Sequence, residues 1–339
     1  MTASPEKPSN QGRTTVLLSA PYLIPAFDRF RAAFDRAGIR VILAEVQERL
    51  SAEQLLRYAG DFDATICGDD QYSADVLQAA APRLKVISKW GTGIDSIDLE
   101  AAKRLGILVR NTPGAFTEAV ADSVVGYVLT FARGLPWMDR SVKAGEWRKY
   151  PGKSLSECTL GVVGVGRIGL AVLERAAAFG MTLLGNDIVM VDLGEIAGVG
   201  ARMVSLEELL EASDFVSLNC DLNPGSRHLI NARTLGVMRS GAVLINTSRG
   251  AVVDEVALTE ALRSGKLAGA ALDVFEEEPL PANSPLRGMD NVLLAPHNSN
   301  ASPGGWERVH WNTIGNLFEG LGLSRPEPWP QVQVAPAER

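Results

Sequence analysis

The chain has 339 residues and a formal net charge of −7 at pH 7, and 46% of its residues are hydrophobic and 6% aromatic. This length suits two domains better than one core, and the composition, with 33 glycines, is typical of an α/β protein with many tight turns. The acidic balance argues against a nucleic-acid or anionic-membrane surface, and no stretch approaches the roughly 18 apolar residues of a membrane-spanning helix.

The first residues, the cysteines and the histidines add further expectations. Residues 1–11 are polar, carry Pro5 and Pro8 and lack the hydrophobic region of a signal peptide, so we expect a flexible tail there. The cysteines are far apart without a CxxC pair, and the histidines lack metal-ligand spacing. These residues are Cys67, Cys158, Cys220, His228, His297 and His310. We expect no disulfide framework, no metal site and a cytoplasmic location.

Short apolar runs alternate with helical patterns over the first 110 residues. Strands are expected at Thr15–Ser19, Arg40–Ala44, Ala64–Cys67, Lys85–Lys89 and Leu108–Arg110. Helical patterns lie between them, for example at Ala26–Ala37, Ala52–Tyr58 and Leu99–Leu105. This alternation predicts a parallel sheet with crossover helices.

A long helix is expected after Pro113, at about Glu118–Arg133. Its apolar positions wrap most of its circumference, and a helix of this kind is buried. We therefore expect it to lie inside the molecule, between two alternating series.

The most specific pattern opens the second series. The strand Thr159–Val163 enters a Gly-x-Gly-x-x-Gly turn formed by Gly164, Gly166 and Gly169, and a helical run follows. Gly164 permits a tight turn, Gly166 lets the backbone approach a pyrophosphate, and Gly169 allows close helix–strand packing. The free N–H groups at the helix start favour a bound anion. The pattern predicts a dinucleotide site.

The residue after the second strand of this series indicates which dinucleotide binds. Asp187 lies 18 residues past Gly169, where a carboxylate accepts hydrogen bonds from the adenosine ribose. It would repel a 2′-phosphate, and Ile188 offers no positive charge to offset that repulsion. NAD is therefore favoured over NADP.

Reactive groups follow the later strands, which we expect at Phe215–Leu218, Ala242–Asn246, Gly269–Leu272 and Val292–Leu294. Arg249 follows the second of these, the run Glu276-Glu277-Glu278 follows the third, and His297 follows the fourth. Ligands of an open parallel sheet bind at the carboxyl ends of the strands, so these groups should converge there. A guanidinium for a carboxylate, an imidazole for a proton and an acid to orient the imidazole suit hydride transfer to a keto acid. Spacing alone does not choose among the three glutamates.

A final helix is expected at Pro303–Gly322. Trp306 and His310 share one face of it, because they are four residues apart. Two interpretations stay open: this face packs the helix onto its domain, or it closes over the substrate.

Taken together, these residues resemble the D-isomer-specific 2-hydroxyacid dehydrogenases, over roughly Leu17 to Leu321. The resemblance rests on the glycine fingerprint and on the motifs Lys89-Trp90-Gly91-Thr92-Gly93-Ile94-Asp95-Ser96-Ile97-Asp98, Asn111-Thr112-Pro113-Gly114, Val120-Ala121-Asp122, Asn246-Thr247-Ser248-Arg249-Gly250, Asp273-Val274-Phe275-Glu276-Glu277-Glu278-Pro279 and Pro296-His297. It implies two doubly wound parallel-sheet α/β domains, a flavodoxin-like substrate domain at 12–113 with 300–325 and a Rossmann NAD-binding domain at 114–299. Residues 1–11 and 326–339 would be flexible tails.

The resemblance also implies roles for single residues. Arg249 would bind the substrate carboxylate and carbonyl, His297 would be the general acid/base, and Glu278 its partner. Asp273 would meet the nicotinamide carboxamide, and the turn Gly91-Thr92-Gly93 would offer N–H groups to the substrate. The implied cofactor contacts are Gly164, Gly166, Arg167, Ile168, Gly169, Asp187, Thr247, Ser248 and Asp273.

Some positions depart from the family pattern. The chain reads Asn298-Ser299-Asn300 after the histidine where an apolar residue and glycine are common, and Asp122 stands where glutamate is usual. Asn219 and Asp221 replace a histidine and a proline beside the cofactor. The loop Gly68-Asp69-Asp70-Gln71-Tyr72 is acidic where relatives with phosphorylated substrates carry arginines, which disfavours such substrates.

The resulting prediction is an NAD-dependent oxidoreductase that transfers a hydride between NAD(H) and a small D-2-hydroxy or 2-keto acid. A phosphite-type dehydrogenase on the same fold is an alternative, whereas formate enzymes lack the glutamate partner. An NADH-sensing corepressor-like scaffold is another, although the sequence shows no added peptide groove or basic surface. We further expect a hinge where the chain crosses between lobes, near Pro113 and near Asn300, and a homodimer formed through the long helix and the arm after it.

Overall fold

The computed structural model describes residues 13–191 and 193–327, which form two compact units. Unit 1 extends to Ala115 and resumes at Trp306, and unit 2 is Phe116–Gly305. The tails predicted at 1–11 and 326–339 lie outside the described residues, apart from Pro326 and Glu327.

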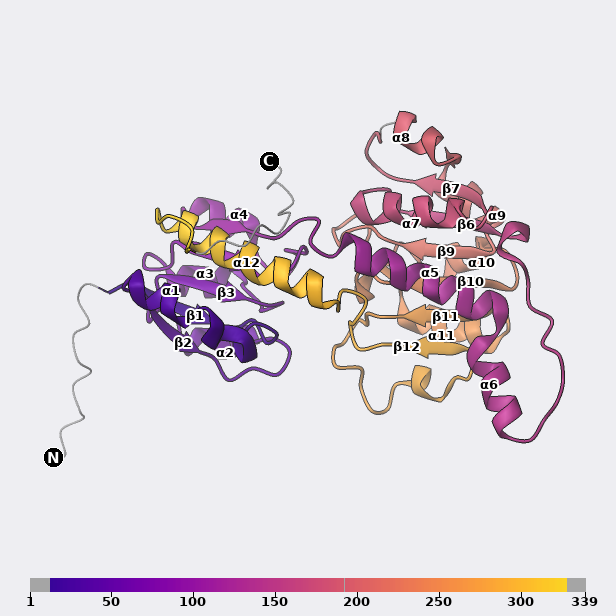
Figure 1. The fold of residues 1–339 in the computed structure, drawn as a ribbon, viewed down its shortest axis with the longest axis horizontal. Coiled ribbons are helices and arrows are strands. Elements are labelled where there is room, and N and C mark those ends of the chain that lie inside the picture. The colour runs from indigo at the N-terminus through magenta and orange to yellow at the C-terminus, as the bar shows by residue number, and fades with distance from the viewer. Residues whose placement is uncertain (1–12, 192, 328–339) are drawn as a thin grey trace. The chain divides into compact units, whose positions relative to one another are not determined.

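Unit 1 is built on a five-stranded sheet in the order β2-β1-β3-β4-β5, in which every neighbouring pair is parallel (Figure 1). Its strands are β1 Thr15–Leu18, β2 Arg40–Leu43, β3 Ala64–Cys67, β4 Val86–Lys89 and β5 Leu108–Arg110. β1, β3 and β4 are buried over their whole length, because helices cover both faces. The order is the flavodoxin-like doubly wound one, as predicted.

The helices of unit 1 bury one stripe each against this sheet. They are η1 Ile24–Arg29, α1 Arg31–Arg36, α2 Ala52–Leu56, α3 Ala74–Ala80, α4 Leu99–Arg104 and α12 Pro303–Gly320, of which the part from Trp306 onward belongs to unit 1. The single helix expected at Ala26–Ala37 is wrong, because the chain forms a 3-10 turn to Arg29 and restarts as an α-helix at Arg31. Both helix types place residues three apart on one face, so the apolar pattern could not separate them.

α12 closes unit 1 although it comes last among the elements. Ser88 Oγ in β4 donates to the carbonyl of Thr313 at 2.7 Å, and Asn316 Nδ2 donates to the carbonyl of Asn111 at 2.8 Å. The rings of Phe34 and Phe318 meet edge to face at 5.3 Å. The first and last parts of the chain therefore share one core.

Unit 2 contains a seven-stranded parallel sheet in the order β12-β11-β10-β9-β6-β7-β8. Its strands are β6 Thr159–Val163, β7 Thr182–Asn186, β8 Ala201–Met203, β9 Phe215–Leu218, β10 Ala242–Asn246, β11 Leu267–Leu272 and β12 Val292–Leu294. Its helices are α5 Thr117–Arg133, α6 Leu135–Lys143, η2 Leu155–Glu157, α7 Arg167–Ala177, α8 Leu193–Gly198, α9 Leu206–Ala212, α10 Ala232–Val237, η3 Gly250–Val252, α11 Glu255–Arg263 and η4 Pro285–Gly288. The order reverses between β6 and β9, as in a Rossmann sheet.

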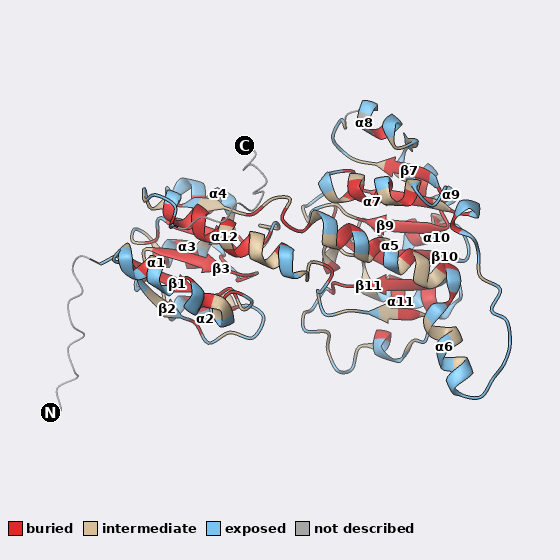
Figure 2. Cartoon of the chain, in the orientation of Figure 1, coloured by how far each residue is buried: buried red, intermediate tan, exposed pale blue. Residues whose placement is uncertain are grey.

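The sheet of unit 2 separates two hydrophobic cores, one on each face. Its central strands are coloured as buried in Figure 2. Leu244 and Ala242 of β10 enter the core beneath α9, α10 and α11. Val243 and Ile245 of the same strand enter the core beneath α5 and α7. Alternate strand residues point to opposite faces, so an unbroken apolar strand fills both cores. The prediction of two doubly wound α/β domains is confirmed.

The expectation that the long helix is buried all round is wrong. α5 buries one stripe, which includes Val120, Val124, Val128 and Ala132. On its surface, the Arg175 guanidinium of α7 pairs with Glu118 and with Asp122, the latter at 2.7 Å. The remaining apolar residues of α5 are only half-buried within this chain.

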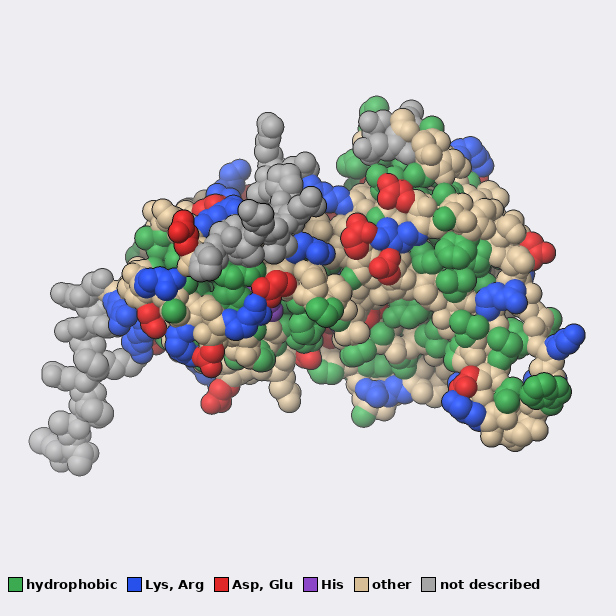
Figure 3. All heavy atoms as spheres, viewed as in Figure 1, with side chains coloured by type: hydrophobic (Ala, Val, Ile, Leu, Met, Phe, Trp, Pro, Cys, Tyr) green, Lys and Arg blue, Asp and Glu red, His purple; other side chains and the backbone are tan. Residues whose placement is uncertain are grey.

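Gly134 follows the last residue of α5 and has a left-handed φ of 63°. The same residue caps the start of the next helix, α6. α6 and the segment after it expose large apolar side chains: Leu135 is 50% exposed, Val142 51%, Tyr150 44% and Trp147 92%. Hydrophobic side chains gather on this part of the surface in Figure 3. Within the described ranges, no helix combines the length and apolarity that crossing a bilayer requires.

Candidate functional site

The glycine fingerprint forms the turn between β6 and α7. Gly164 has a φ of 87°, and a Cβ there would lie 2.5 Å from the backbone nitrogen of Cys220. A Cβ at Gly169 would lie 2.1 Å from the carbonyl oxygen of Gly164. A Cβ at Gly166 would meet no atom within 4 Å. Gly164 and Gly169 are thus required by packing, whereas the space at Gly166 is open to a ligand.

α7 presents its N-terminus to that open space. It begins at Arg167, directly after Gly166, and buries Ala171, Val172, Leu173 and Ala176 against the sheet. The first N–H groups of a helix have no partner inside the helix, and the helix dipole adds positive potential there. Arg167, Ile168 and Gly169 form this first turn, which suits a diphosphate.

Asp187 closes the second strand of the fingerprint. Its Oδ2 accepts the N–H of Val165 at 2.7 Å and its Oδ1 accepts the N–H of Val189 at 3.0 Å. Each carboxylate oxygen has a second lone pair for a ribose hydroxyl. Ile188 beside it is 90% exposed and brings no charge. A carboxylate fixed in this way suits a ribose diol better than a ribose phosphate.

Two buried polar atoms lie at the ends of the neighbouring strands. Asn219 Oδ1, after β9, and Thr247 Oγ1, after β10, have no hydrogen-bond partner among the described residues although both atoms are shielded from solvent. Buried polar atoms are costly when unpaired. Together with the open turn and Asp187, they fit a dinucleotide at this edge of the sheet.

Arg249 stands at a corner that Asn246 organises. Asn246 is 1% exposed; its Oδ1 accepts from Ser248 N–H at 3.1 Å and Ser248 Oγ–H at 2.8 Å, and its Nδ2 donates to the Arg249 carbonyl at 2.9 Å. The guanidinium donates from Nη1 to the Ser248 carbonyl at 2.9 Å. The sequence motif includes Asn246 without predicting a role for it, although an amide at the end of an apolar strand is a signal for such a corner.

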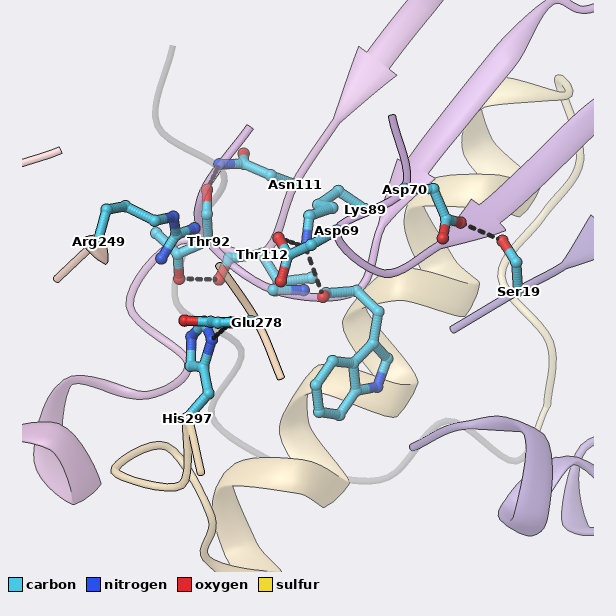
Figure 4. Close-up of polar contacts among 12 residues, drawn as sticks. Ser19, Asp69, Asp70, Lys89, Thr92, Asn111, Thr112, Arg249, Glu278 and His297 are labelled. Carbon is cyan, nitrogen blue, oxygen red and sulfur yellow. Dashed lines mark hydrogen bonds and ion pairs between the residues drawn. The ribbon is translucent and has the colours of Figure 1, made fainter. Parts of the chain in front are cut away.

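Glu278 and His297 are brought together after β11 and β12, as Figure 4 shows. Glu278 Oε2 lies 3.0 Å from His297 Nδ1, and its Oε1 accepts the N–H of Phe275 at 3.0 Å. A carboxylate at Nδ1 favours a proton on that nitrogen and leaves Nε2 for proton exchange. Glu276 contacts His228 instead, with 3.2 Å between Oε1 and Nε2, and Glu277 is exposed. The geometry therefore selects Glu278 from the three glutamates.

Asp273 holds the loop that carries His297. Its carboxylate is 1% exposed and accepts the N–H groups of Asn298 at 2.7 Å and Ser299 at 2.8 Å, and its carbonyl accepts the N–H of His297 at 2.8 Å. His297 has a φ of 52°. Only backbone groups of Asn298 and Ser299 are used here, so their departure from the family pattern leaves this clamp intact.

The turn Gly91-Thr92-Gly93 lies in unit 1 after β4. The N–H of Gly91 donates to Thr112 Oγ1 at 3.2 Å, and Thr92 Oγ1 donates to the Thr112 carbonyl at 3.2 Å. Asn111 Nδ2 donates to the Thr92 carbonyl at 2.6 Å. Gly91 is therefore committed to holding the turn.

The acidic loop after β3 presents less negative charge than its sequence suggests. Asp70 is fully buried and accepts from Ser19 Oγ at 2.5 Å and from Leu50 N–H at 2.6 Å, and burial raises its pKa to about 6. Asp69 pairs at 3.0 Å with the Nζ of Lys89, which is 3% exposed and also donates to the Trp90 carbonyl (Figure 4). Lys89 is a buried charge that the sequence reading did not single out. The loop therefore disfavours phosphorylated substrates less than its sequence indicates.

Trp306 and His310 pack within unit 1. Trp90 Nε1 donates to His310 Nδ1 at 3.0 Å, and the ring of Trp306 lies 5.1 Å from that of Tyr22. Burial lowers the pKa of His310 to about 4, so the ring is a neutral acceptor. Of the two interpretations of this helix face, the structure favours packing.

Comparison with known proteins agrees with this site. Residues 125–299 match the model for the D-isomer specific 2-hydroxyacid dehydrogenase, NAD binding domain. The chain is 44% identical to a glyoxylate reductase of Thermofilum pendens over 81% of this chain and 83% of that one. It is 41% identical to a D-3-phosphoglycerate dehydrogenase of Methanocaldococcus jannaschii over 75% of this chain and 48% of that one.

Solved structures show the same likeness. A D-lactate dehydrogenase from Aquifex aeolicus complexed with NAD and lactic acid superposes with a TM-score of 0.80 at 29% identity, over 88% of this chain and 93% of that one. The chain thus belongs to the D-isomer-specific 2-hydroxyacid dehydrogenase family, and it is an NAD-dependent oxidoreductase that transfers a hydride between NAD(H) and a 2-hydroxy or 2-keto acid.

Proposed function

We propose that the chain reduces small 2-keto acids of the size of glyoxylate and hydroxypyruvate, with Arg249, Glu278 and His297 as its catalytic residues. The observation that carries the proposal is the 3.0 Å contact between Glu278 Oε2 and His297 Nδ1, next to the dinucleotide edge of one sheet. Relatives named glyoxylate reductase and hydroxypyruvate reductase support this substrate size.

The proposed division of labour follows from charge. Bound NADH supplies the hydride. The Arg249 guanidinium forks onto the carboxylate and carbonyl of the keto acid and stabilises the charge that develops on the carbonyl oxygen. His297 delivers the proton to that oxygen from Nε2, while Glu278 holds Nδ1–H and stabilises the charged ring.

The remaining assignments belong to the same proposal. Gly164, Gly166, Arg167, Ile168, Gly169 and Asp187 bind the dinucleotide, joined by Thr247, Ser248 and Asp273. Thr92 and Gly93 offer N–H groups to the substrate, since Gly91 is engaged by Thr112. Unit 1 is the substrate domain and unit 2 the NAD domain, with hinges where the chain leaves one for the other.

We also propose a cytoplasmic homodimer. The cysteines are free thiols, which suits a reducing compartment. The exposed apolar residues of α6 and of the segment after it, together with the half-buried apolar side chains of α5, offer a surface for a second copy.

The test is NADH consumption across a panel of glyoxylate, hydroxypyruvate, pyruvate and 3-phosphohydroxypyruvate, with NAD reduction by phosphite measured beside it. Saturable turnover of glyoxylate or hydroxypyruvate supports the proposal. Preference for the phosphorylated acid would overturn the proposed substrate size, and turnover of phosphite alone would replace the proposal with the phosphite alternative. NADH binding without turnover of any of these would favour the corepressor-like scaffold.

A further inference from the structure

His228 and His297 are the non-glycine residues with positive φ in the described part of the chain, at 49° and 52°. Each contacts a glutamate of the same loop. His297 Nδ1 lies 3.0 Å from Glu278 Oε2, and His228 Nε2 lies 3.2 Å from Glu276 Oε1. The pair of His228 and Glu276 has no part in the chemistry proposed above. We therefore consider which segments of the chain this pair connects.

The backbone of His228 is fixed beside the Arg249 corner. Its N–H donates to the carbonyl of Ala251 at 2.8 Å, and its own carbonyl accepts from Asn231 Nδ2 at 2.8 Å. Ala251 is two residues after Arg249. The side chain of His228 therefore extends toward Glu276 from a point tied to the segment that carries Arg249.

The contact with Glu276 is an ion pair when the imidazole is protonated. His228 Nε2 is shielded from solvent, and its approach to Glu276 Oε1 is close without being aligned as a hydrogen bond. A shielded imidazole nitrogen is costly without a polar neighbour, and Glu276 is the carboxylate that reaches it.

Glu276 is in turn tied to the start of α11. Its N–H donates to Glu255 Oε1 at 2.6 Å, and its Oε1 accepts the N–H of Glu255 at 3.1 Å. Burial raises the pKa of Glu255, and the carboxylates of Glu276, Glu278 and Glu277 raise it further. The imidazole of His228, with Nε2 at 3.2 Å from Glu276 Oε1, lies beside this cluster of carboxylates.

The loop so held packs against Gly250, the residue after Arg249, and carries Glu278. The approach is so close that a Cβ at Gly250 would lie 1.8 Å from the carbonyl carbon of Phe275. Phe275 N–H holds Glu278 Oε1 at 3.0 Å. The peptide between Phe275 and Glu276 thus separates the Arg249 corner from the partner of His297.

We propose that His228, acting through Glu276, is a positioning residue that keeps the Arg249 corner and the Glu278 carboxylate in register. It touches neither substrate nor cofactor in this proposal. The inference rests on the proposed roles of Arg249 and Glu278, and it adds the element that sets their mutual geometry.

The test compares His228→Asn, Glu276→Ala and the double variant with the unmodified protein. Asn tolerates positive φ but is too short to reach Glu276, so His228→Asn removes the contact and keeps the backbone. Misplacing groups by about 1 Å costs up to roughly 100-fold in rate, so kcat/KM for the keto acid should fall about 10- to 100-fold in each single variant. The double variant should lose about as much as Glu276→Ala alone, because that change already removes the contact with His228 together with the acceptor of the Glu255 N–H.

Further measurements separate positioning from general damage. Glu277→Ala removes an exposed charge from the same loop and should keep kcat/KM within about twofold, as surface changes usually do. His228→Gln supplies a longer amide donor and should restore most of the loss seen in His228→Asn. KM should rise and kcat fall together, while the thermal midpoint and NADH affinity, read by fluorescence, stay close to those of the unmodified protein.

The outcomes are distinct. An unmodified protein that turns over keto acids, with His228→Asn and Glu276→Ala both at full kcat/KM, overturns this inference alone. Losses that simply add in the double variant, or that His228→Gln does not restore, also overturn it. If His228→Asn does not fold, Glu276→Ala and His228→Gln decide the matter. No turnover in the unmodified protein would instead refute the proposed function.

Discussion

The Glu278 carboxylate is shared between a backbone N–H and an imidazole, and this arrangement has a kinetic signature. The negative charge at 3.0 Å from His297 Nδ1 favours the protonated ring, which reduction requires. Reduction should therefore decline as pH rises and the proton is lost. Glu278→Gln keeps the shape but removes the charge, so that decline should move to lower pH, with NADH affinity unchanged. Rate profiles from pH 5 to 9, with Glu277→Gln as the matched control, measure the shift; an unmoved profile would mean that Glu278 is not the partner.

Asp187 allows a second prediction at the residue scale. Its oxygens keep a lone pair each for a ribose diol, and its charge opposes a 2′-phosphate. NADH should bind much more tightly than NADPH. Asp187→Ala should reduce this difference, because it lowers the affinity for NADH and raises the affinity for NADPH. Titration of both cofactors by fluorescence checks this. Equal affinities in the unmodified protein would contradict it.

Only part of the candidate site could be predicted from the sequence, as single residues show. The family motifs predict roles for Arg249, Glu278 and His297, but spacing alone cannot choose among three glutamates in one loop. That choice depends on which carboxylate the turn after Phe275 directs to His297. The clamp formed by Asp273 was also hidden, because it uses backbone N–H groups of Asn298 and Ser299, which every residue type except proline possesses.

At the scale of elements, the corner after β10 depends on a residue without a side chain. A Cβ at Gly250 would lie 1.8 Å from the backbone of Phe275, which cannot move away like a flexible side chain. Gly250→Ala should push η3 from the loop before Glu278 and lower kcat/KM by roughly 100-fold. Gly236→Ala, where a Cβ meets no atom within 4 Å and φ is not positive either, is the matched control. Equal activity of the two variants would argue against the close approach.

The attachment of α12 to β4 should depend on pH. The folded-state pKa of His310, about 4, lies below its ordinary 6.5, so the neutral ring contributes stability that is complete above pH 6.5 and is lost as pH falls through about 4. The loss is at most about 3 kcal/mol. His310→Asn keeps an acceptor for Trp90 without a titrating ring, so its thermal midpoint should fall less over this range. Parallel curves for both proteins would contradict the prediction.

Strands were easier to predict than helices because parallel strands buried on both faces are continuous apolar runs. Such runs gave β1, β3 and β9 to within a residue. The pattern failed at η1 and α1, where two helix types share one apolar face, and at α5, where apolar residues on the surface imitated burial. For α5, the sequence shows which residues are apolar, but it does not show which neighbouring segments cover them.

At the scale of the whole molecule, the exposed apolar side chains of α6 and the following segment bear on assembly. Trp147 is 92% exposed, and an exposed apolar surface of this kind is unfavourable in water unless another molecule covers it. Sedimentation should show a dimer at micromolar concentration, and Trp147→Gln should weaken it by about 10- to 100-fold in Kd, the range for an aromatic at an interface. Val256→Gln changes a similarly exposed residue on α11 and should leave the dimer intact. A monomer in the unmodified protein would contradict the assembly.

The placement of α12 also bears on the order of events during synthesis. The first 115 residues leave the ribosome early, yet the helix that covers β4 and meets Phe34 follows only after Trp306. Unit 2 is continuous and complete before that helix is translated. In the nascent chain, unit 2 should thus be complete while the sheet of unit 1 still exposes an apolar face. During this interval the exposed face is available for chaperones to bind.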